Sequence, residues 1–118
     1  MTSVTQLKLI NGLATARLGR ECDPKVILQQ IGAMTVLGVC GGKWASVHNY
    51  GYTCGVLLMV GASRAVEVIL DYDDTYSVRR TRLVTSGARK DELVVEYKMS
   101  GIYCDQLTEV VWSASNWK

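Results

Sequence analysis

The chain has 118 residues, of which 48% are hydrophobic and 20% are charged, with a formal net charge of +2. A chain of this length forms one domain whose core buries roughly two thirds of the surface that the unfolded chain exposes. The composition excludes wholesale disorder, and the near-neutral charge differs from the strong basic excess of typical nucleic-acid-binding domains. No apolar run reaches the length that a membrane-spanning helix needs.

Residues 1–22 are predicted to form a helical N-terminal extension, followed by a single α+β domain over residues 23–118. Apolar residues recur in the extension at helical spacing, at Leu7, Ile10, Ala14 and Leu18. The extension has neither the uninterrupted apolar run nor the cleavage-site ending of a secretory signal. We therefore expect an intracellular protein whose four cysteines stay reduced.

A helix is predicted over residues 24–31. Asp23 is a suitable N-cap, Pro24 at the first helical position needs no backbone donor, and Gly32 suits the end of a helix. The next apolar segment, residues 34–40, is rich in β-forming residues and apolar at both odd and even positions. That pattern predicts a central strand that is covered on both sides.

Residues 43–52 predict a turn or an irregular hairpin tip, and residues 54–60 predict a second buried strand. A strict alternation over residues 65–72 indicates an antiparallel sheet with one covered face, and the side chains expected to face the helices are Val66, Val68 and Leu70. Asp73 and Asp74 follow as a turn, because short carboxylates can accept hydrogen bonds from nearby backbone N–H groups.

The strand predicted over residues 75–84 carries basic side chains on both faces, which is typical of an edge strand or a protruding arm. A further alternating strand is predicted over residues 93–99, with four inward residues, Leu93, Val95, Tyr97 and Met99. A last helix is predicted over residues 101–114, and its core-facing stripe consists of Tyr103, Leu107, Val110, Val111 and Ala114. The expected fold is α+β, an antiparallel sheet of about four to five strands with the N-terminal helices and the C-terminal helix packed on one face.

Three runs of the sequence, ILQQIG–MTVLGVCGGK, LDYDDTYSVRRTRL and SGIYCDQLTEVV, resemble a family of small proteins carried by bacteriophages and plasmids. The matching features are Ile31-Gly32, Met34 to Lys43, Asp74-Thr75-Tyr76 and Ile102 to Leu107. The resemblance covers roughly residues 26–112 and departs from the family pattern over residues 36–42. It implies an origin on a mobile element, and hence the cytoplasm of a bacterial host, but no mechanism.

Two sets of residues are candidates for partner binding. Aromatic residues dominate the hot spots of protein interfaces, so a protein partner is expected to bind Trp44, Tyr50 and Tyr52, unless these cap the core under a hairpin. A phosphate backbone would instead follow the basic strand, with bases stacked on Tyr76 and Tyr97, and the basic residues are Arg79, Arg80, Arg82, Arg89 and Lys90. The simpler interpretation of the basic strand is a solvated edge.

The sequence contains no recognisable catalytic signature. The nearest approach to a zinc site is Cys40, His48 and Cys54, which lack a paired-cysteine motif, and we expect neither a metal nor a cofactor. We therefore expect a non-enzymatic accessory protein of a phage or mobile element that binds another protein, with a host or defence component as the candidate partner. The alternative is a nucleic-acid-binding module, and an exposed edge strand would also permit a homodimer.

Overall fold

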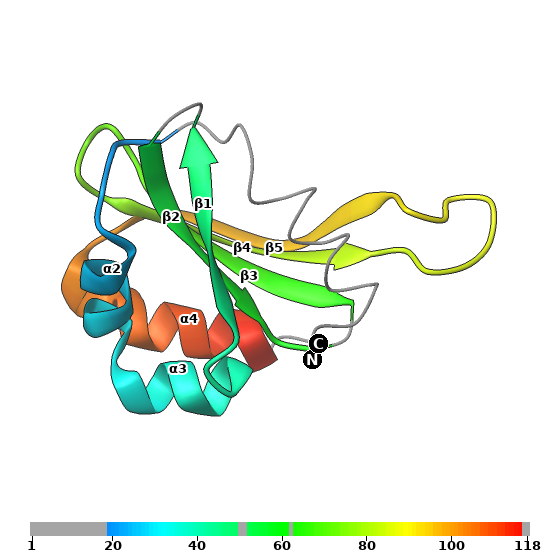
Figure 1. The fold of residues 1–118 in the computed structure, drawn as a ribbon, viewed down its shortest axis with the longest axis horizontal. Coiled ribbons are helices and arrows are strands. Elements are labelled where there is room, and N and C mark those ends of the chain that lie inside the picture. The colour runs from blue at the N-terminus through cyan, green and yellow to red at the C-terminus, as the bar shows by residue number, and fades with distance from the viewer. Residues whose placement is uncertain (1–18, 50–51, 62, 117–118) are drawn as a thin grey trace.

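The computed structural model describes residues 19–49, 52–61 and 63–116. It shows an α+β fold with a five-stranded antiparallel sheet in the order β1-β2-β3-β4-β5 (Figure 1). The strands are β1 (Trp44–Asn49), β2 (Tyr52–Met59), β3 (Arg64–Leu70), β4 (Tyr76–Leu83) and β5 (Leu93–Ile102). The helices are α2 (Pro24–Ile31), α3 (Ala33–Cys40), a single 3-10 turn η1 (Cys104–Gln106) and α4 (Leu107–Asn116). The predicted fold class is therefore confirmed.

Helices α2, α3 and α4 lie together on one face of the sheet (Figure 1). The predicted helix α2 begins as expected, since a carboxylate oxygen of Asp23 accepts a hydrogen bond from the backbone N–H of Lys25 at 2.9 Å. It ends at Gly32, whose φ of 101° is a conformation that glycine adopts without strain. Ile27 and Ile31 are fully buried against the sheet, as the sequence pattern indicates.

The segment predicted as a central strand is instead the helix α3, so that prediction is wrong. An apolar run without clear periodicity fits a packed helix as well as a buried strand. Two glycines with positive φ delimit the helix, Gly32 before it and Gly41 after it, and the N–H of Gly41 donates to the carbonyl of Leu37 at 2.8 Å. Val36 and Cys40 are the buried residues of α3 and belong to the helix-side core.

The segment predicted as a turn over residues 43–52 contains the whole edge strand β1 and the first residue of β2. Trp44 pairs with Leu58 at one end of the β1–β2 ladder, and Asn49 pairs with Tyr52 at the other. A strand forms here because Ala45 and Val47 alternate with more polar neighbours and can pack on the sheet's second face.

The face of the sheet opposite the helices is also buried. Its core cluster consists of Val47, Cys54, Leu57, Met59, Ala65, Ile69 and Leu83. The expectation of only one covered face is therefore wrong. Residues 19–22, the described part of the predicted extension, are tied to the sheet by hydrogen bonds from Arg20 N to Leu70 O (2.7 Å) and from Cys22 N to Thr53 O (2.9 Å). The helix predicted from Leu7 to Leu18 lies outside the described residues.

The predicted acidic turn between β3 and β4 forms, and the Asp73 carboxylate is satisfied within it. Asp73 accepts hydrogen bonds from the backbone N–H (3.1 Å) and hydroxyl (2.6 Å) of Thr75, and these bonds hold the pKa of the Asp73 carboxyl below its usual value. Asp74 adopts a left-handed conformation with a φ of 66° and forms an ion pair with Arg20. The turn thus anchors the segment that precedes α2.

Strand β4 lies inside the sheet, between β3 and β5, so the prediction of an edge strand is wrong. The β4–β5 hairpin nevertheless extends beyond the rest of the molecule as an arm (Figure 1), and residues 85–92 at its tip are exposed. Register shifts in β5 interrupt the predicted alternation of its side chains. Leu93 consequently packs on the second face, whereas Tyr97 packs on the helix side.

The last helix begins later than predicted. Strand β5 continues to Ile102, and the 3-10 turn η1 separates it from α4. The core-facing stripe of α4 is confirmed at Leu107, Val111 and Ala114, which are all fully buried. Tyr103, which the sequence pattern also placed on that stripe, precedes the helix and is exposed.

Candidate functional site

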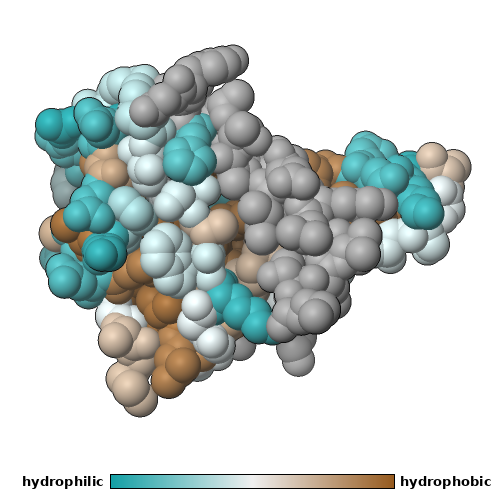
Figure 2. All heavy atoms as spheres, in the orientation of Figure 1, coloured by the Kyte–Doolittle hydropathy of each residue, from teal (hydrophilic) through white to brown (hydrophobic). Residues whose placement is uncertain are grey.

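The outer face of α3 is an exposed hydrophobic surface. The side chains of Met34 and Leu37 are 80% and 58% exposed, although both belong to a helix that contains no charged residue. Figure 2 shows hydrophobic residues gathered at the lower edge of the molecule, where Figure 1 places α3. Contiguous exposed apolar patches on soluble proteins are typical of interaction surfaces.

An open groove of about 430 Å³ lies beside the Leu37 side chain, and its lining is almost entirely apolar. It is lined by Leu28, Gln29, Ala33, Val36, Leu37 and Gly42. On another side of α3, the exposed indole of Trp112 from α4 packs close to Gly38. A Cβ atom added to this glycine would lie only 3.3 Å from the ring. We call Met34, Leu37, Trp112 and the groove the α3 surface.

Two of the three predicted aromatic residues, Trp44 and Tyr52, lie at opposite ends of the β1–β2 ladder. Trp44 pairs with Leu58 of the helix-side core, so it lies on the same side of the sheet as α3. Tyr52 lies at the other end of the β1–β2 ladder and packs on the second face. Its hydroxyl donates to the carbonyl of Gly19 at 2.9 Å, which indicates a structural role. Tyr50 is outside the described residues.

Arg79 of the predicted basic set forms a buried ion pair. It lies directly across from Glu67 on β3, and its Nε donates to a Glu67 carboxylate oxygen at 2.7 Å. The Glu67 side chain is 0% exposed. A carboxylate at such a position needs a hydrogen-bonded cation, because burying an unpaired charge costs several kcal/mol. The positive charge of Arg79 therefore stabilises the buried carboxylate of Glu67.

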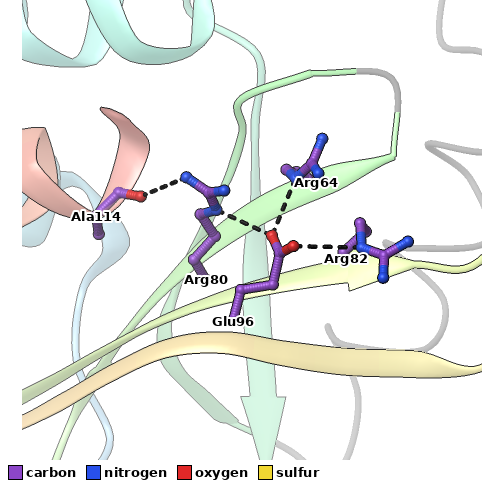
Figure 3. Close-up of polar contacts among 5 residues, drawn as sticks. All are labelled: Arg64, Arg80, Arg82, Glu96 and Ala114. Carbon is purple, nitrogen blue, oxygen red and sulfur yellow. Dashed lines mark hydrogen bonds and ion pairs between the residues drawn. The ribbon is translucent and has the colours of Figure 1, made fainter. Parts of the chain in front are cut away.

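Arg80 and Arg82 point to the opposite face of the sheet, where they share the carboxylate of Glu96 (Figure 3). Arg64 of β3, which lies outside the basic run of residues 79–90, donates to the same carboxylate at 2.9 Å. We call Arg64, Arg80, Arg82 and Glu96 the arginine cluster. Glu96 reaches it because it is the extra residue of a β-bulge: Tyr97 pairs with Arg80 and Val95 with Thr81.

The remaining basic residues of the predicted set, Arg89 and Lys90, lie at the tip of the β4–β5 arm. Arg89 forms two hydrogen bonds with Glu92, of 2.7 and 2.8 Å, and both side chains are exposed. The five predicted basic residues therefore occupy three separate places. No single surface formed by all five follows from this geometry, and nucleic-acid binding stays a prediction.

The two tyrosines proposed to stack on bases, Tyr76 and Tyr97, both pack in or against the helix-side core. Tyr76 is buried in the helix-side core, and its hydroxyl donates to Gln30 at 2.5 Å. Burial raises the pKa of the Tyr76 hydroxyl above its usual value. Tyr97 is half-buried against the same core. Base stacking would therefore require Tyr76 to leave its packing site.

The residues closest to a thiol or zinc site do not form one cluster. Cys40 belongs to the helix-side core, whereas Cys54 belongs to the core on the opposite face. Burial raises the pKa of the Cys22 thiol to about 11, and burial also raises that of Cys40. Within the described ranges, no three His, Cys, Asp or Glu side chains are grouped as metal ligands would be, and no helix is long and apolar enough to span a membrane.

Comparison of the chain with models of protein families, with curated proteins and with solved structures finds no match in any of the three.

Proposed function

We propose that this chain is a non-enzymatic accessory protein of a phage or mobile element, which acts in the bacterial cytoplasm by binding another protein through the α3 surface. The observation that carries this proposal is the exposure of Met34 and Leu37 on a helix that also borders an uncharged groove. The centres of protein interfaces are enriched in methionine and aromatic residues and depleted of charge. The α3 surface has this composition.

The shape of the α3 surface indicates how a partner binds. Met34 and Leu37 project from the helix, and the groove between α2 and α3 offers a recess for an apolar side chain of the partner. A complementary surface must itself be largely apolar, because no charged side chain lines the groove. A host or defence component that presents an apolar helix or loop fits this requirement.

Two further points support the proposal. The raised thiol pKa values of Cys22 and Cys40 leave little thiolate at neutral pH, which makes both residues poor nucleophiles. The origin on a mobile element is supported by the sequence runs that resemble phage- and plasmid-borne proteins, which include the α3 segment from Met34 to Lys43.

The test is affinity capture from a bacterial lysate with the wild-type chain and with the double variant Met34→Ser/Leu37→Ser. Both residues are exposed, so the variant should fold, and circular dichroism verifies this. Val95→Ser is the matched control, because Val95 is an exposed apolar residue on β5, away from α3. We expect a discrete partner whose recovery falls about tenfold or more in the double variant and is unchanged in the control.

Two outcomes would contradict the proposal. Equal recovery with the wild-type chain and the folded double variant would show that the α3 surface does not bind the partner. Light scattering gives the second outcome: a wild-type dimer that becomes a monomer in the double variant would assign the α3 surface to self-association.

A further inference from the structure

The arginine cluster carries more positive than negative charge. Three guanidinium groups meet one carboxylate: Glu96 accepts from Arg64 Nε at 2.9 Å, from Arg80 Nε at 3.1 Å and from Arg82 Nε at 3.2 Å (Figure 3). Guanidinium groups stay protonated in proteins. Burial raises the pKa of the Glu96 carboxyl, but hydrogen bonds and charge from Arg64 and Arg80 outweigh it and lower the pKa below its usual value. The cluster therefore carries a net charge of +2 at neutral pH.

The fold compensates one of the three arginines better than the other two. Arg80 is buried, and its Nη1 donates to the carbonyl of Ala114 at 3.3 Å, in the last turn of α4. The carboxyl end of a helix carries partial negative charge, so this contact favours a cation. Within the described ranges, Glu96 is the sole ion-pair partner of Arg64 and of Arg82. The excess charge therefore belongs to these two residues.

Arg64 and Arg82 are also placed side by side. They are direct cross-strand partners in the β3–β4 ladder, an arrangement in which like charges repel each other. Their side chains are 43% and 36% exposed, so a ligand can reach them from solvent. Both contact Glu96 through Nε, which orients the guanidinium groups and leaves their terminal nitrogens as further donors.

We propose that Arg64 and Arg82 form a binding site for a phosphate dianion, either inorganic phosphate or the terminal group of a phosphate monoester. Glu96 positions the two guanidinium groups, and the buried guanidinium of Arg80 adds positive charge to the site. A dianion matches the net charge of the cluster, whereas a carboxylate supplies half of the required charge. Paired arginines also suit the several oxygens of a phosphate, because each guanidinium can donate two parallel hydrogen bonds.

The geometry favours a single phosphate over a nucleic-acid backbone. A phosphodiester carries one charge per phosphate, and its binding sites extend along a row of basic side chains. Here Arg79 is paired on the opposite face and Arg89 lies on the arm, so neither continues the site. The proposal does not depend on the α3 surface, because it uses none of the same residues.

The test is titration of the ¹⁵N-labelled full chain with phenyl phosphate, sulfate and acetate at matched ionic strength, followed through the Nε–H signals of arginine. We expect the signals of Arg64 and Arg82 to shift with phenyl phosphate and sulfate at concentrations where acetate has no effect. Calorimetry should show binding weakened about tenfold or more in Arg64→Gln and in Arg82→Gln. Arg82→Lys should bind with intermediate affinity, because lysine keeps the charge but lacks the fork.

The matched control is Arg89→Gln, which removes an exposed arginine from the arm and should leave binding unchanged. The charge of the ligand is tested separately, because a phosphate monoester has a second pKa of about 6 and changes from monoanion to dianion between about pH 5 and pH 7.5. Phenyl phosphate should therefore bind more tightly at the higher pH. Sulfate is a dianion at both, so its affinity should stay constant.

Three results would overturn the proposal. The first is that the Nε–H signals of Arg64 and Arg82 do not shift. The second is equal affinity for phosphate in folded Arg82→Gln and in the wild-type chain. The third is preferential binding of a short single-stranded oligonucleotide without a terminal phosphate, which would assign the cluster to a nucleic-acid backbone.

Discussion

Arg79 and Arg80 are neighbours in the sequence but belong to two different kinds of charge arrangement. Arg79 faces the second core and forms an ion pair with Glu67, which is completely buried. Arg80 faces the helices and joins a cluster in which three arginines share Glu96. The first arrangement joins a fully buried carboxylate to its cross-strand arginine. The second is partly exposed and has excess positive charge, so the same residue type supports the core on one face and offers a binding site on the other.

The largest effect is expected from breaking the buried pair of Arg79 and Glu67. Arg79→Leu removes the Arg79 cation from beside the buried Glu67 carboxylate, which should lower the free energy of unfolding by about 3–5 kcal/mol. The double variant Glu67→Leu/Arg79→Leu removes both charges and should regain most of this loss, because buried ion pairs are often replaceable by apolar residues. Urea denaturation measures both values. A double variant no more stable than Arg79→Leu would show that the pair contributes more than mutual neutralisation.

The arginine cluster should respond differently when its carboxylate is removed. Glu96→Gln breaks charged hydrogen bonds and leaves three arginines close together, so we expect a loss of about 1.5–3 kcal/mol in the free energy of unfolding. Because the remaining charge attracts anions, sulfate should restore more stability than chloride at equal ionic strength. Urea denaturation in the two salts tests this, and equal recovery in both would argue against a specific anion site.

The contribution of Glu96 should also depend on pH. Its folded-state pKa lies below the unfolded value of 4.5, so its ionised form stabilises the fold above about that pH. The stability difference between wild type and Glu96→Gln should therefore be constant near neutral pH and shrink as the pH falls through the folded-state pKa. Comparing the two proteins cancels the contributions of Asp73 and Glu92, whose pKa values are also lowered. A difference that does not vary with pH would contradict this assignment.

The elements with local signals were predictable from the sequence. Asp23, Pro24 and Gly32 specify the limits of α2, and the alternation of Val66, Val68 and Leu70 specifies the helix-facing side of β3. The segment that became α3 was not predictable in this way, because its apolar residues show no period and only packing decides between helix and strand. A strand covered on both sides would bury Met34 and Leu37. The α3 surface, on which both are exposed, could therefore not be predicted from the sequence.

The ion-pair partners in the sheet could not be predicted for a different reason. The basic run is visible in the sequence, but its partners Glu67 and Glu96 are specified by strand order and register. A one-residue shift moves a side chain to the other face of a sheet. The bulge at Glu96 has this effect: alternation alone assigns Glu96 to the face opposite Tyr97, whereas the bulge brings it to the helix side with Arg80.

Removing one exposed arginine of the cluster should change stability little. Arg82→Gln loses one hydrogen bond to Glu96 but also relieves the repulsion between Arg82 and its cross-strand partner Arg64. We expect a change below about 1 kcal/mol in the free energy of unfolding, in contrast to Arg79→Leu. Urea denaturation of Arg82→Gln and Arg79→Leu under the same conditions measures this contrast. Equal losses would show that the cluster is as essential to the core as the buried pair.

The smallest effect is expected at the tip of the arm, where Arg89 and Glu92 are both exposed. Their hydrogen bonds are short, but water solvates both charges after the pair is broken and salt screens their attraction. Arg89→Gln should therefore leave the urea midpoint unchanged within error. A measurable loss would mean that the arm is held by contacts beyond the pair. Arg79, Arg82 and Arg89 then form a series. The loss of stability on mutation of each arginine follows the burial of its carboxylate partner, which decreases from Glu67 to Glu96 to Glu92.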